Sequence, residues 1–572
     1  MATHKRNGAK PFPANKKPCT EIQRTRQRLP IYAHRSKILE TLDNNRVVIL
    51  VGETGSGKTT QVPQYIFERN RNERIAITQP RRVAAISVAQ RVCEEANRGQ
   101  LGETVGYCVR FDDTTSKDEA HERTLETDIL FGVVKQALRK RKDLRVVVMS
   151  ATLDVALFQK FFEDSKPAVI QIPGRMFNVD VFYTAMTQPD YLDSALVAVL
   201  QIHLEEQDNG SILVFLTGQA EAAKMLICPI FAAMPREQQM KVFEPAPPGV
   251  RKVILATNIA ETSITINGIR YVVDTGLVKQ RSFVAKSGME MLQTAPVSKA
   301  QAWQRTGRAG REAPGVCYRL FPEETFDQLA ERAIPDIQRV SLEVVVLQLK
   351  CMGIDDVLGF DFIEKPKVNS LVKAMEKLYA LGAFDPEGKL TERGRQMAGL
   401  PVEPMYAEEA LSVVAMLSVE SIFYSPRDKK EQAAQSRAKF QAYEGDQTRV
   451  ENVRNQLKGY LERLELPISS SFPDIDPLRK SIVAGFFLNT AMRSQSEGSG
   501  GSKTAFKTMC GRSEIVKVHP SSSLFMRNPP PKWVVYNELV YTSKYYIRSV
   551  VIIEKEWLLE LAPKFFTKLA QT

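Results

Sequence analysis

The sequence predicts an α/β protein in which a parallel sheet is built around a phosphate-binding loop. Residues 47–51 form an apolar, β-branched run that is typical of a buried parallel strand. Residues 52–59 follow it with the pattern G-x-x-x-x-G-K-T, and residues 61–66 suit the first helix after the loop. Similar strand-like runs that end in small polar residues recur at residues 145–149, 211–216 and 252–256. This pattern predicts two consecutive α/β units.

The loop after the first strand contains the residue types that hold a triphosphate. Its glycines let backbone N–H groups turn inward around phosphate oxygens, and the following helix N-terminus adds positive potential. Lys58 is expected to reach the β- and γ-phosphates, and the Thr59 hydroxyl is expected to ligate Mg²⁺. The alternative, a glycine-rich turn that matches by chance, is disfavoured by the intact motif and its preceding strand. The predicted nucleotide-binding residues of the loop are Gly52, Glu53, Thr54, Gly55, Ser56, Gly57, Lys58, Thr59 and Thr60.

Length and composition are those of a soluble protein with several domains. The chain has 572 residues, of which 43% are hydrophobic and 25% are charged, and its net charge is +12. This charge favours a polyanionic partner, although a merely soluble basic surface would share it. The seven cysteines include no CxxC pair, so we expect a reducing compartment without a zinc site or a disulfide framework. We expect no membrane association, because no apolar run approaches the roughly 18 residues of a membrane span.

The first 28 residues carry eight lysines and arginines against a single acid, Glu21. This composition predicts a disordered basic arm. A nuclear address, an RNA-contacting tail and a solvated terminus are all compatible with it.

Charged pairs occur twice in the first unit. Arg81 and Arg82 follow the expected strand 74–78, where they are well placed to hold a phosphate backbone. Asp118 and Glu119 form an acidic pair of the kind that holds Mg²⁺ and deprotonates an attacking water. The same unit is expected to contain a helix over residues 83–92 and a strand over residues 105–111.

The second unit contains a run of regularly spaced arginines. Arg305, Arg308 and Arg311 are three residues apart, so on one helix face their guanidinium groups would lie together. No acid within this segment would neutralise them, which predicts a bound anion. The alternative is a basic surface helix.

These segments occur in a fixed order that resembles the superfamily 2 helicases. The letters DEAH at residues 118–121 and QRTGRAGR at residues 304–311 resemble the DEAH-box RNA helicases in particular, and the resemblance extends from Leu29 to the C-terminus. It implies two RecA-like domains that bind ATP in their cleft and single-stranded RNA across their top. Winged-helix, helical-bundle (ratchet) and OB-fold domains would follow. The expected boundaries are 1–28 for the basic arm, 29–173 and 174–325 for the RecA-like domains, 326–400 for the winged helix, 401–488 for the bundle, 489–545 for the OB-fold and 546–572 for a C-terminal extension.

The resemblance also implies which residues act on the nucleotide. Residues of both RecA-like domains form the catalytic set, in which the last two arginines face the γ-phosphate as fingers: Asp118, Glu119, His121, Gln304, Arg308 and Arg311. The cofactors are then ATP and Mg²⁺, and the implied metal-binding residues are Thr59, Asp118 and Glu119. The implied base and ribose contacts are Arg91, Phe243 and Asn267. Because stacking reads a π-face, we expect weak discrimination among bases.

A further set of residues is implied to contact RNA or to couple the two sites. The RNA-backbone contacts would come from Arg81, Arg82, Arg110, Thr257 and Asn258. Ser150 and Thr152 would couple the nucleotide site to the RNA site. Short β-rich runs at residues 515–519, 533–536 and 545–547 suit an OB-fold, although most of their aromatic residues, and His519, are expected to be structural.

Three features depart from the family's pattern. Thr217 stands where the family usually has proline, and Asn267 stands where an aspartate commonly meets the ribose. The third departure is larger, because Asp118 directly follows residues 115–117 without the apolar strand that carries this motif in family members. We infer that a segment is missing there, and we expect similar omissions near Ile227/Cys228, Ala407/Glu408 and Gln447/Thr448, where expected helices are truncated.

The function predicted from these features is an ATP-dependent RNA helicase that translocates 3′ to 5′ and remodels RNA or RNA–protein complexes. A catalytically idle RNA-binding scaffold and a DNA translocase are the alternatives. Residues 454–461 and the basic arm favour ribosomal RNA processing in the nucleolus over pre-mRNA splicing. We expect a monomer within a larger particle, with an activating protein as a further possible partner.

Overall fold

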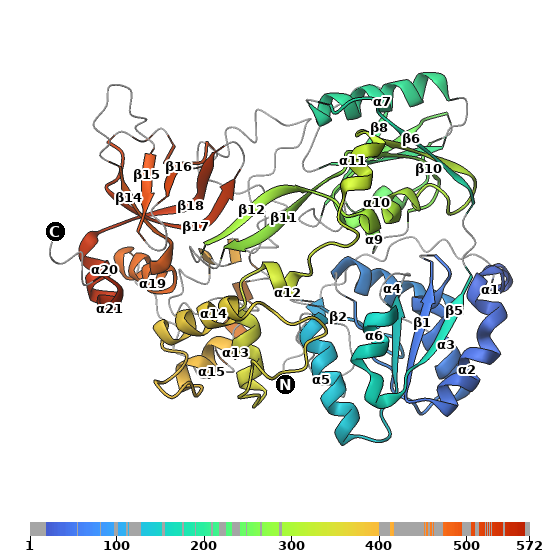
Figure 1. Ribbon diagram of the computed structural model, residues 1–572, viewed down its shortest axis with the longest axis horizontal. Helices are drawn as coiled ribbons and strands as arrows, with labels where there is room; N and C mark the ends of the chain where they lie inside the picture. Colours follow the sequence, from blue (N-terminus) through green and yellow to red (C-terminus); the bar gives the residue numbers. More distant parts are fainter. Residues whose placement is uncertain are drawn as a thin grey trace, which may run out of the picture. The chain divides into compact units, whose positions relative to one another are not determined.

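The computed structural model contains two compact units (Figure 1), formed by residues 1–124 with 137–176 and by residues 125–136 with 177–572. It describes residues 19–53, 55–79, 82–96, 101–109, 112–113, 127–150, 155–173, 177–188, 190–206, 210–216, 225–231, 239, 241–247, 249–262, 266–284, 289–399, 412–413, 415–416, 451, 454–455, 458–459, 462, 473–494, 505–509, 514–520, 522, 524–525, 527, 529–541 and 544–566.

The first unit is built on a parallel sheet with the phosphate-loop strand at its centre. Strand β1 (Val47–Gly52) pairs with β4 (Val146–Ser150) on one side and with β5 (Ala168–Ile172) on the other. All six residues of β1 are buried, as expected for a parallel strand covered on both faces. This confirms the predicted parallel sheet around the loop.

Strand β4 lies at the edge of the described part of this sheet. Two other strand predictions for the first unit are wrong. Residues 74–78 have no regular structure, and the expected strand 105–111 is reduced to β2 (Cys108–Val109), which pairs with β3 (Asp112–Asp113). An apolar run becomes a strand only where a neighbouring strand satisfies its backbone. Four of the five residues of β4 are only half-buried, which agrees with the inferred lack of a strand before Asp118. Residues 114–126 lie outside the described part of the chain.

The helices of the first unit include one that the composition did not predict. They are α1 (Cys19–Arg28), η1 (Pro30–His34), α2 (Arg35–Asn44), α3 (Lys58–Arg69), α4 (Arg82–Ala96), α6 (Val155–Phe161) and η2 (Glu163–Ser165). The prediction of a disordered arm is wrong for residues 19–28. Arg26 of α1 donates to Glu68 and Gln61 of α3, each at 2.9 Å. These partners lie 42 and 35 residues away, so local charge could not reveal them.

The second unit contains a larger parallel sheet. Its strands β6 (Val179–Tyr183), β7 (Ser211–Phe215), β8 (Leu226–Ile230), β9 (Lys252–Ala256), β10 (Ile269–Asp274) and β13 (Gly315–Arg319) lie in the order β6-β13-β10-β7-β9-β8. The helices that follow its strands are α7 (Tyr191–Glu205), α9 (Ile259–Thr262), α10 (Lys299–Thr306) and α11 (Glu323–Gln328). The carboxyl ends of parallel strands meet at one edge of a sheet, which is where such folds bind ligands.

A helical cluster follows at the expected winged-helix position. It comprises α12 (Asp336–Arg339), α13 (Glu343–Cys351), α14 (Val368–Ala380) and α15 (Glu392–Gly399), with a small bridge between Phe384 and Leu390. Helix α5 (Thr127–Lys140) contributes Ile129 to the core of this cluster. Gly132 of α5 lies against Phe360, where an added Cβ would approach the ring within 2.3 Å. The predicted ratchet comprises residues 401–488. Most of its residues up to 472 lie outside the described part of the chain.

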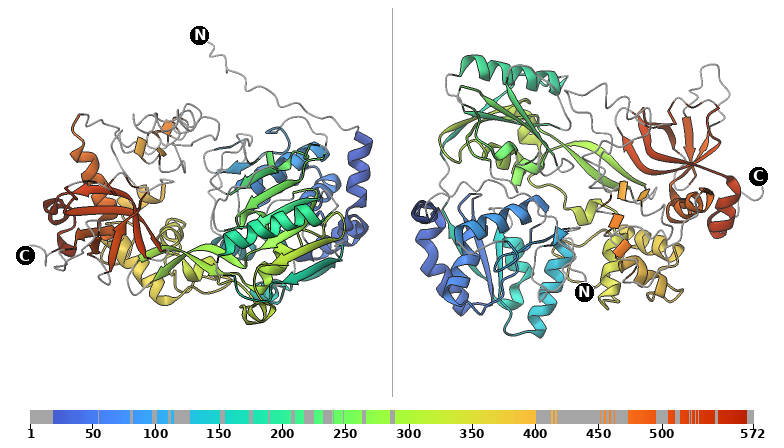
Figure 2. Two further views of the ribbon diagram at one scale, coloured as in Figure 1. Left: turned by 90° about the horizontal axis from the view of Figure 1, so that it is seen from above. Right: turned by 180° about the vertical axis from the view of Figure 1, so that it is seen from behind.

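The C-terminal strands close into a barrel (Figure 2). Strands β14 (Thr490–Arg493), β15 (Ala505–Thr508), β16 (Ile515–Val518), β17 (Trp533–Tyr541) and β18 (Tyr545–Ile553) pair in a ring, because β18 contacts both β16 and β17. This confirms the predicted OB-fold, whose first strand begins next to the expected boundary at 489. The expected boundary at 545 is wrong, because β18 runs to Ile553 and pairs with both β16 and β17. The barrel strands share one hydrophobic core, and a second core joins β17 and β18 to the surrounding helices. These helices are α19 (Asp476–Phe486), η5 (Phe487–Asn489), α20 (Lys555–Leu561) and α21 (Pro563–Phe566).

A hairpin connects this barrel with the preceding sheet. Strands β11 (Leu277–Val284) and β12 (Met289–Pro296) pair along their whole length, and β12 also pairs in parallel with β17 through Met291 and Leu292. The hairpin begins directly after β10, so one continuous segment belongs to both structures. Among the described residues, no helix is long and apolar enough to cross a membrane.

Candidate functional site

The phosphate loop has the backbone conformation that its glycines predict. Gly55 and Gly57 have φ values of +90° and +91°, in the left-handed region that favours glycine. A Cβ on Gly57 would also lie 2.9 Å from Leu29 and 3.1 Å from Ile31. Helix α3 begins immediately after this residue, so its N-terminal backbone donors belong to the loop. Of the nine loop residues predicted, Thr54 lies outside the described part.

Lys58 is buried within the loop and is surrounded by oxygen atoms. Its Nζ donates to the carbonyl oxygens of Gly52 and Glu53, the latter at 2.8 Å, and approaches Ser56 Oγ at 3.2 Å. Burial lowers the pKa of Lys58 to about 8, against the opposing effect of Glu53. The Lys58 ammonium group donates to protein oxygens in place of water, and phosphate oxygens are acceptors of the same kind. The loop therefore fits a triphosphate.

The arginine motif of the second unit differs from the predicted helix. Helix α10 ends at Thr306, so Arg308 and Arg311 lie beyond it. Arg305 is fully buried and donates to Glu261 at 3.1 Å and to Asp274 at 2.7 Å. Burial alone would lower the pKa of Arg305, but these two carboxylates outweigh it and raise that pKa. The three arginines thus do not gather their guanidinium groups on one helix face.

Arg308 and Arg311 have different surroundings. Arg308 is buried and its Nε donates to the Glu261 carbonyl oxygen at 2.9 Å. The three guanidinium nitrogens of Arg311 are inaccessible to solvent and have no hydrogen-bond partner among the described residues. Burial lowers the pKa of Arg311 to about 10, opposed by Glu312. A buried cation without partners is costly, so Arg311 is the member of the motif that calls for an anionic ligand.

Other predicted residues of the second unit lie at strand ends or in turns. Phe243 belongs to η3 (Lys241–Phe243), and the buried Lys252 ammonium holds this turn by donating to the carbonyl oxygens of Val242, at 2.9 Å, and Glu244. Thr257 and the exposed Asn258 follow β9, at the carboxyl edge of the sheet. Asn267 is exposed in the turn before β10, and Gln304 is half-buried on α10.

In the first unit, only part of the predicted set can be placed. Arg91 is half-exposed on α4, and Ser150 is half-buried at the end of β4. Arg82 begins α4, but its side chain is outside the description. The remaining predicted residues of this unit lie outside the described residues: Arg81, Arg110, Asp118, Glu119, His121 and Thr152.

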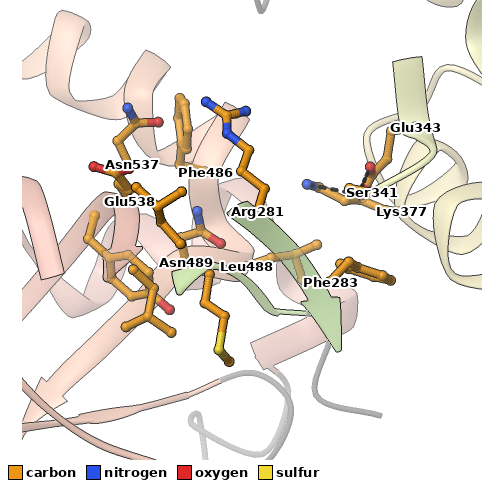
Figure 3. Close-up of a pocket in the computed structure, with 15 residues that line it drawn as sticks. Arg281, Phe283, Ser341, Glu343, Lys377, Phe486, Leu488, Asn489, Asn537 and Glu538 are labelled. Atoms are coloured by element: carbon orange, nitrogen blue, oxygen red, sulfur yellow. Dashed lines mark hydrogen bonds and ion pairs between the residues drawn. The ribbon is translucent and has the colours of Figure 1, made fainter. Parts of the chain in front are cut away.

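The second unit also contains a cavity of about 210 Å³ between the hairpin, the winged-helix segment and the barrel (Figure 3). Arg281 and Phe283 reach it from β11, and Phe486 from the end of α19. Lys377 lies on another side, 3.3 Å from Glu343. Cationic and aromatic side chains of this kind suit single-stranded nucleic acid, and sequence reasoning had not singled them out.

Comparison with known proteins identifies the same succession of domains. Family models match residues 194–313 (helicase conserved C-terminal domain), 374–402 (helicase associated domain HA2, winged-helix), 406–459 (HA2, ratchet-like) and 478–565 (oligonucleotide/oligosaccharide-binding OB-fold). The chain is 41% identical over 664 positions to the human ATP-dependent RNA helicase DHX33, covering 99% of this chain and 91% of that protein. It is also 41% identical over 651 positions to the probable ATP-dependent RNA helicase DHX35 of Pongo abelii, covering 95% and 89%.

A solved structure shares the fold. The crystal structure of the E. coli DExH-box NTPase HrpB has a TM-score of 0.73 and 26% sequence identity, covering 94% of this chain and 70% of that one. The alignment with DHX33 has 664 positions and the chain has 572 residues, so at least 92 positions lie opposite gaps in this chain. These gaps agree with the inferred absence of internal segments.

The pKa of Lys58 predicts how nucleotide affinity depends on pH. The charged form binds phosphate, so affinity should be nearly constant below about pH 8 and should fall above it. The fall should approach about tenfold per pH unit, because each binding event then requires a proton. Calorimetric titration with a non-hydrolysable ATP analogue between pH 7 and 9.5 measures this profile. The Lys58→Arg variant serves as the control, since an arginine keeps its charge throughout; a flat profile in the unmodified chain would contradict the assignment.

Proposed function

The chain belongs to the DEAH-box family of superfamily 2 RNA helicases, and we propose that it translocates 3′ to 5′ along single-stranded RNA and acts on ribosomal RNA or its complexes. It is an ATP-dependent RNA helicase with nucleoside triphosphatase activity, as its near-full-length relatives are. The observation that best supports a chemical role for a particular residue is the solvent-inaccessible Arg311 guanidinium, which has no partner among the described residues.

We propose that hydrolysis requires residues of both units. Lys58 and the α3 N-terminus hold the triphosphate, and Thr59, Asp118 and Glu119 hold Mg²⁺, with Glu119 as the base that takes the proton of the attacking water. Arg311 neutralises the charge that spreads over the phosphoryl oxygens, for which a planar guanidinium is suited. Arg308, which donates to the Glu261 carbonyl, supports the same segment.

RNA binding is supported by the family relationship and by the OB-fold. We propose that Arg81, Arg82, Arg110, Thr257 and Asn258 contact the RNA backbone. The cavity between the hairpin and the barrel would hold bases of the same strand, because Phe283 and Phe486 offer stacking surfaces beside Arg281.

Replacing Arg311 by alanine should reduce RNA-stimulated ATP hydrolysis by on the order of 10³-fold or more, with little change in nucleotide or RNA affinity. The reason is that a finger acts mainly on the transition state. Turnover and both affinities are measured on the same preparation. The exposed Arg332→Ala variant is the control for loss of a cation in the same unit. If turnover survives, or if nucleotide affinity falls in proportion to rate, Arg311 is not a finger.

The proposed direction predicts a dependence on the single-stranded tail of the substrate. A duplex with a 3′ RNA tail should be unwound in the presence of ATP, whereas the same duplex with a 5′ tail or a blunt end should not. Strand separation on native gels measures this, and a 3′ DNA tail distinguishes an RNA translocase from a DNA translocase. Equal unwinding from the 5′ tail would contradict the proposal.

The proposed pathway is ribosomal RNA processing in the nucleolus, favoured by the basic N-terminal residues and by the segment 454–461. Crosslinking the tagged chain to RNA in cells, followed by sequencing, should enrich ribosomal RNA precursors, and imaging should place the chain in nucleoli. A tag-only protein controls for background. Enrichment of intron-containing transcripts instead would favour the splicing alternative.

A further inference from the structure

A buried carboxylate joins two helices of the first unit that have different assigned roles. Glu95 lies on α4, and its side chain is only 3% exposed. Its Oε2 accepts hydrogen bonds from Gln61 Nε2 at 2.6 Å and from Gln64 Nε2 at 2.9 Å, both on α3. Its Oε1 accepts from Arg91 Nε at 2.6 Å. Both oxygens of one buried carboxylate are thus occupied by donors from two helices.

On α3, both the oxygen and the nitrogen of the Gln61 side-chain amide have hydrogen-bond partners. Gln61 is fully buried and follows Lys58 by one helical turn. Its Oε1 accepts from Arg26 Nε of α1 at 2.9 Å, and its Nε2 also contacts Thr60 Oγ1 at 3.0 Å. The amide orientation is therefore determined by its neighbours, and the carboxylate is held at a fixed place beside the phosphate-binding helix.

On α4, part of the Arg91 side chain remains accessible to a ligand. Glu95 occupies the Nε edge of Arg91, while the Arg91 side chain remains 49% exposed. An exposed arginine would otherwise sample several rotamers, and ordering it on ligand binding would reduce the affinity. A buried charge-assisted hydrogen bond sets the position of the guanidinium before any ligand binds.

We infer that Glu95 is a positioning residue for nucleotide binding: it holds Arg91 at a fixed distance from the phosphate-binding helix, so that one ligand can meet both. This rests on the contact between Arg91 and the nucleotide base that the resemblance to DEAH-box helicases implies. The neighbouring Glu94 differs, because its side chain is 66% exposed and lies 4.0 Å from Arg91 Nη1. It offers a matched control on the same helix, with the same change of charge.

The test compares ATP with inorganic tripolyphosphate, which has the phosphates but no base. Glu95→Gln leaves a single side-chain oxygen for donors from two helices, so either Arg91 or the α3 amides lose their acceptor. We expect affinity for Mg²⁺–ATP, measured by calorimetry on the full chain, to fall on the order of five- to tenfold. Affinity for Mg²⁺–tripolyphosphate should stay within about twofold, and Glu94→Gln should change neither.

The Arg91→Ala variant separates failure of this inference from failure of the implied contact between Arg91 and the base. If Arg91→Ala leaves the ratio of the two affinities unchanged, Arg91 does not bind the base. If Arg91→Ala lowers the ratio and Glu95→Gln does not, the positioning role is wrong. Equal losses for both ligands in Glu95→Gln would make Glu95 a structural support of the loop instead. In the double variant the ATP loss should equal that of Arg91→Ala alone.

Glu95→Asp provides a second variant if Glu95→Gln does not fold, as judged by circular dichroism. It keeps the charge and the two acceptor oxygens but withdraws them by one methylene. Like Glu95→Gln, it should lower the ratio of the affinity for ATP to the affinity for tripolyphosphate. An unchanged ratio in a folded Glu95→Asp variant would overturn the inference.

Discussion

Compensation of buried charge is the constraint on which both α/β units depend. Removing a charged group from water costs several kcal/mol unless partners replace the lost solvation. Lys58 and Lys252 are buried against backbone carbonyl oxygens, and Arg305 is buried between Glu261 and Asp274. Each arrangement connects separate segments: the phosphate loop with helix α3, the η3 turn with β9, and α10 with α9 and the end of β10.

The same constraint explains why the three arginines of one short motif have different roles. Arg305 has two carboxylate partners, and Arg308 has a carbonyl partner, so both are satisfied by the protein itself. The guanidinium of Arg311 is also inaccessible to solvent, but it has no carboxylate or carbonyl partner among the described residues. A regular spacing of three in the sequence cannot distinguish these cases, because the partners come from β10 and α9.

What the sequence could predict was local, and what it missed depended on distant partners. The phosphate loop, the buried strands beginning at Val47, Ser211 and Lys252, and the helix at Arg82 are contiguous patterns, so they were predicted correctly. Helix α1 was missed because its stabilising acid, Glu68, lies on another helix. The predicted end of the barrel at residue 545 was too early. The strand that begins at Tyr545 pairs with β16 and β17 and closes the sheet, and these partners are distant in the sequence. Glu95 gave no signal because a single glutamate in an amphipathic helix is ordinarily solvated.

Within the second unit, charge compensation also links the arginine motif to the barrel. Besides its carboxylate partners, Arg305 donates to the carbonyl oxygen of Leu277 at 3.2 Å, which is the first residue of the hairpin. Gly276 precedes it with φ +71°, at a place where a Cβ would lie 2.6 Å from Phe321.

The position from which the hairpin starts is therefore fixed by the same buried arginine that anchors the motif of Arg311. At its other end the hairpin pairs with β17, beside a cavity lined by cationic and aromatic residues. A helicase must connect triphosphate chemistry to a nucleic-acid strand, and a contiguous set of packed and hydrogen-bonded elements is the physical means of doing so. In this unit a contiguous set of hydrogen-bonded elements runs from Arg305 through β11 and β12 to β17 of the barrel.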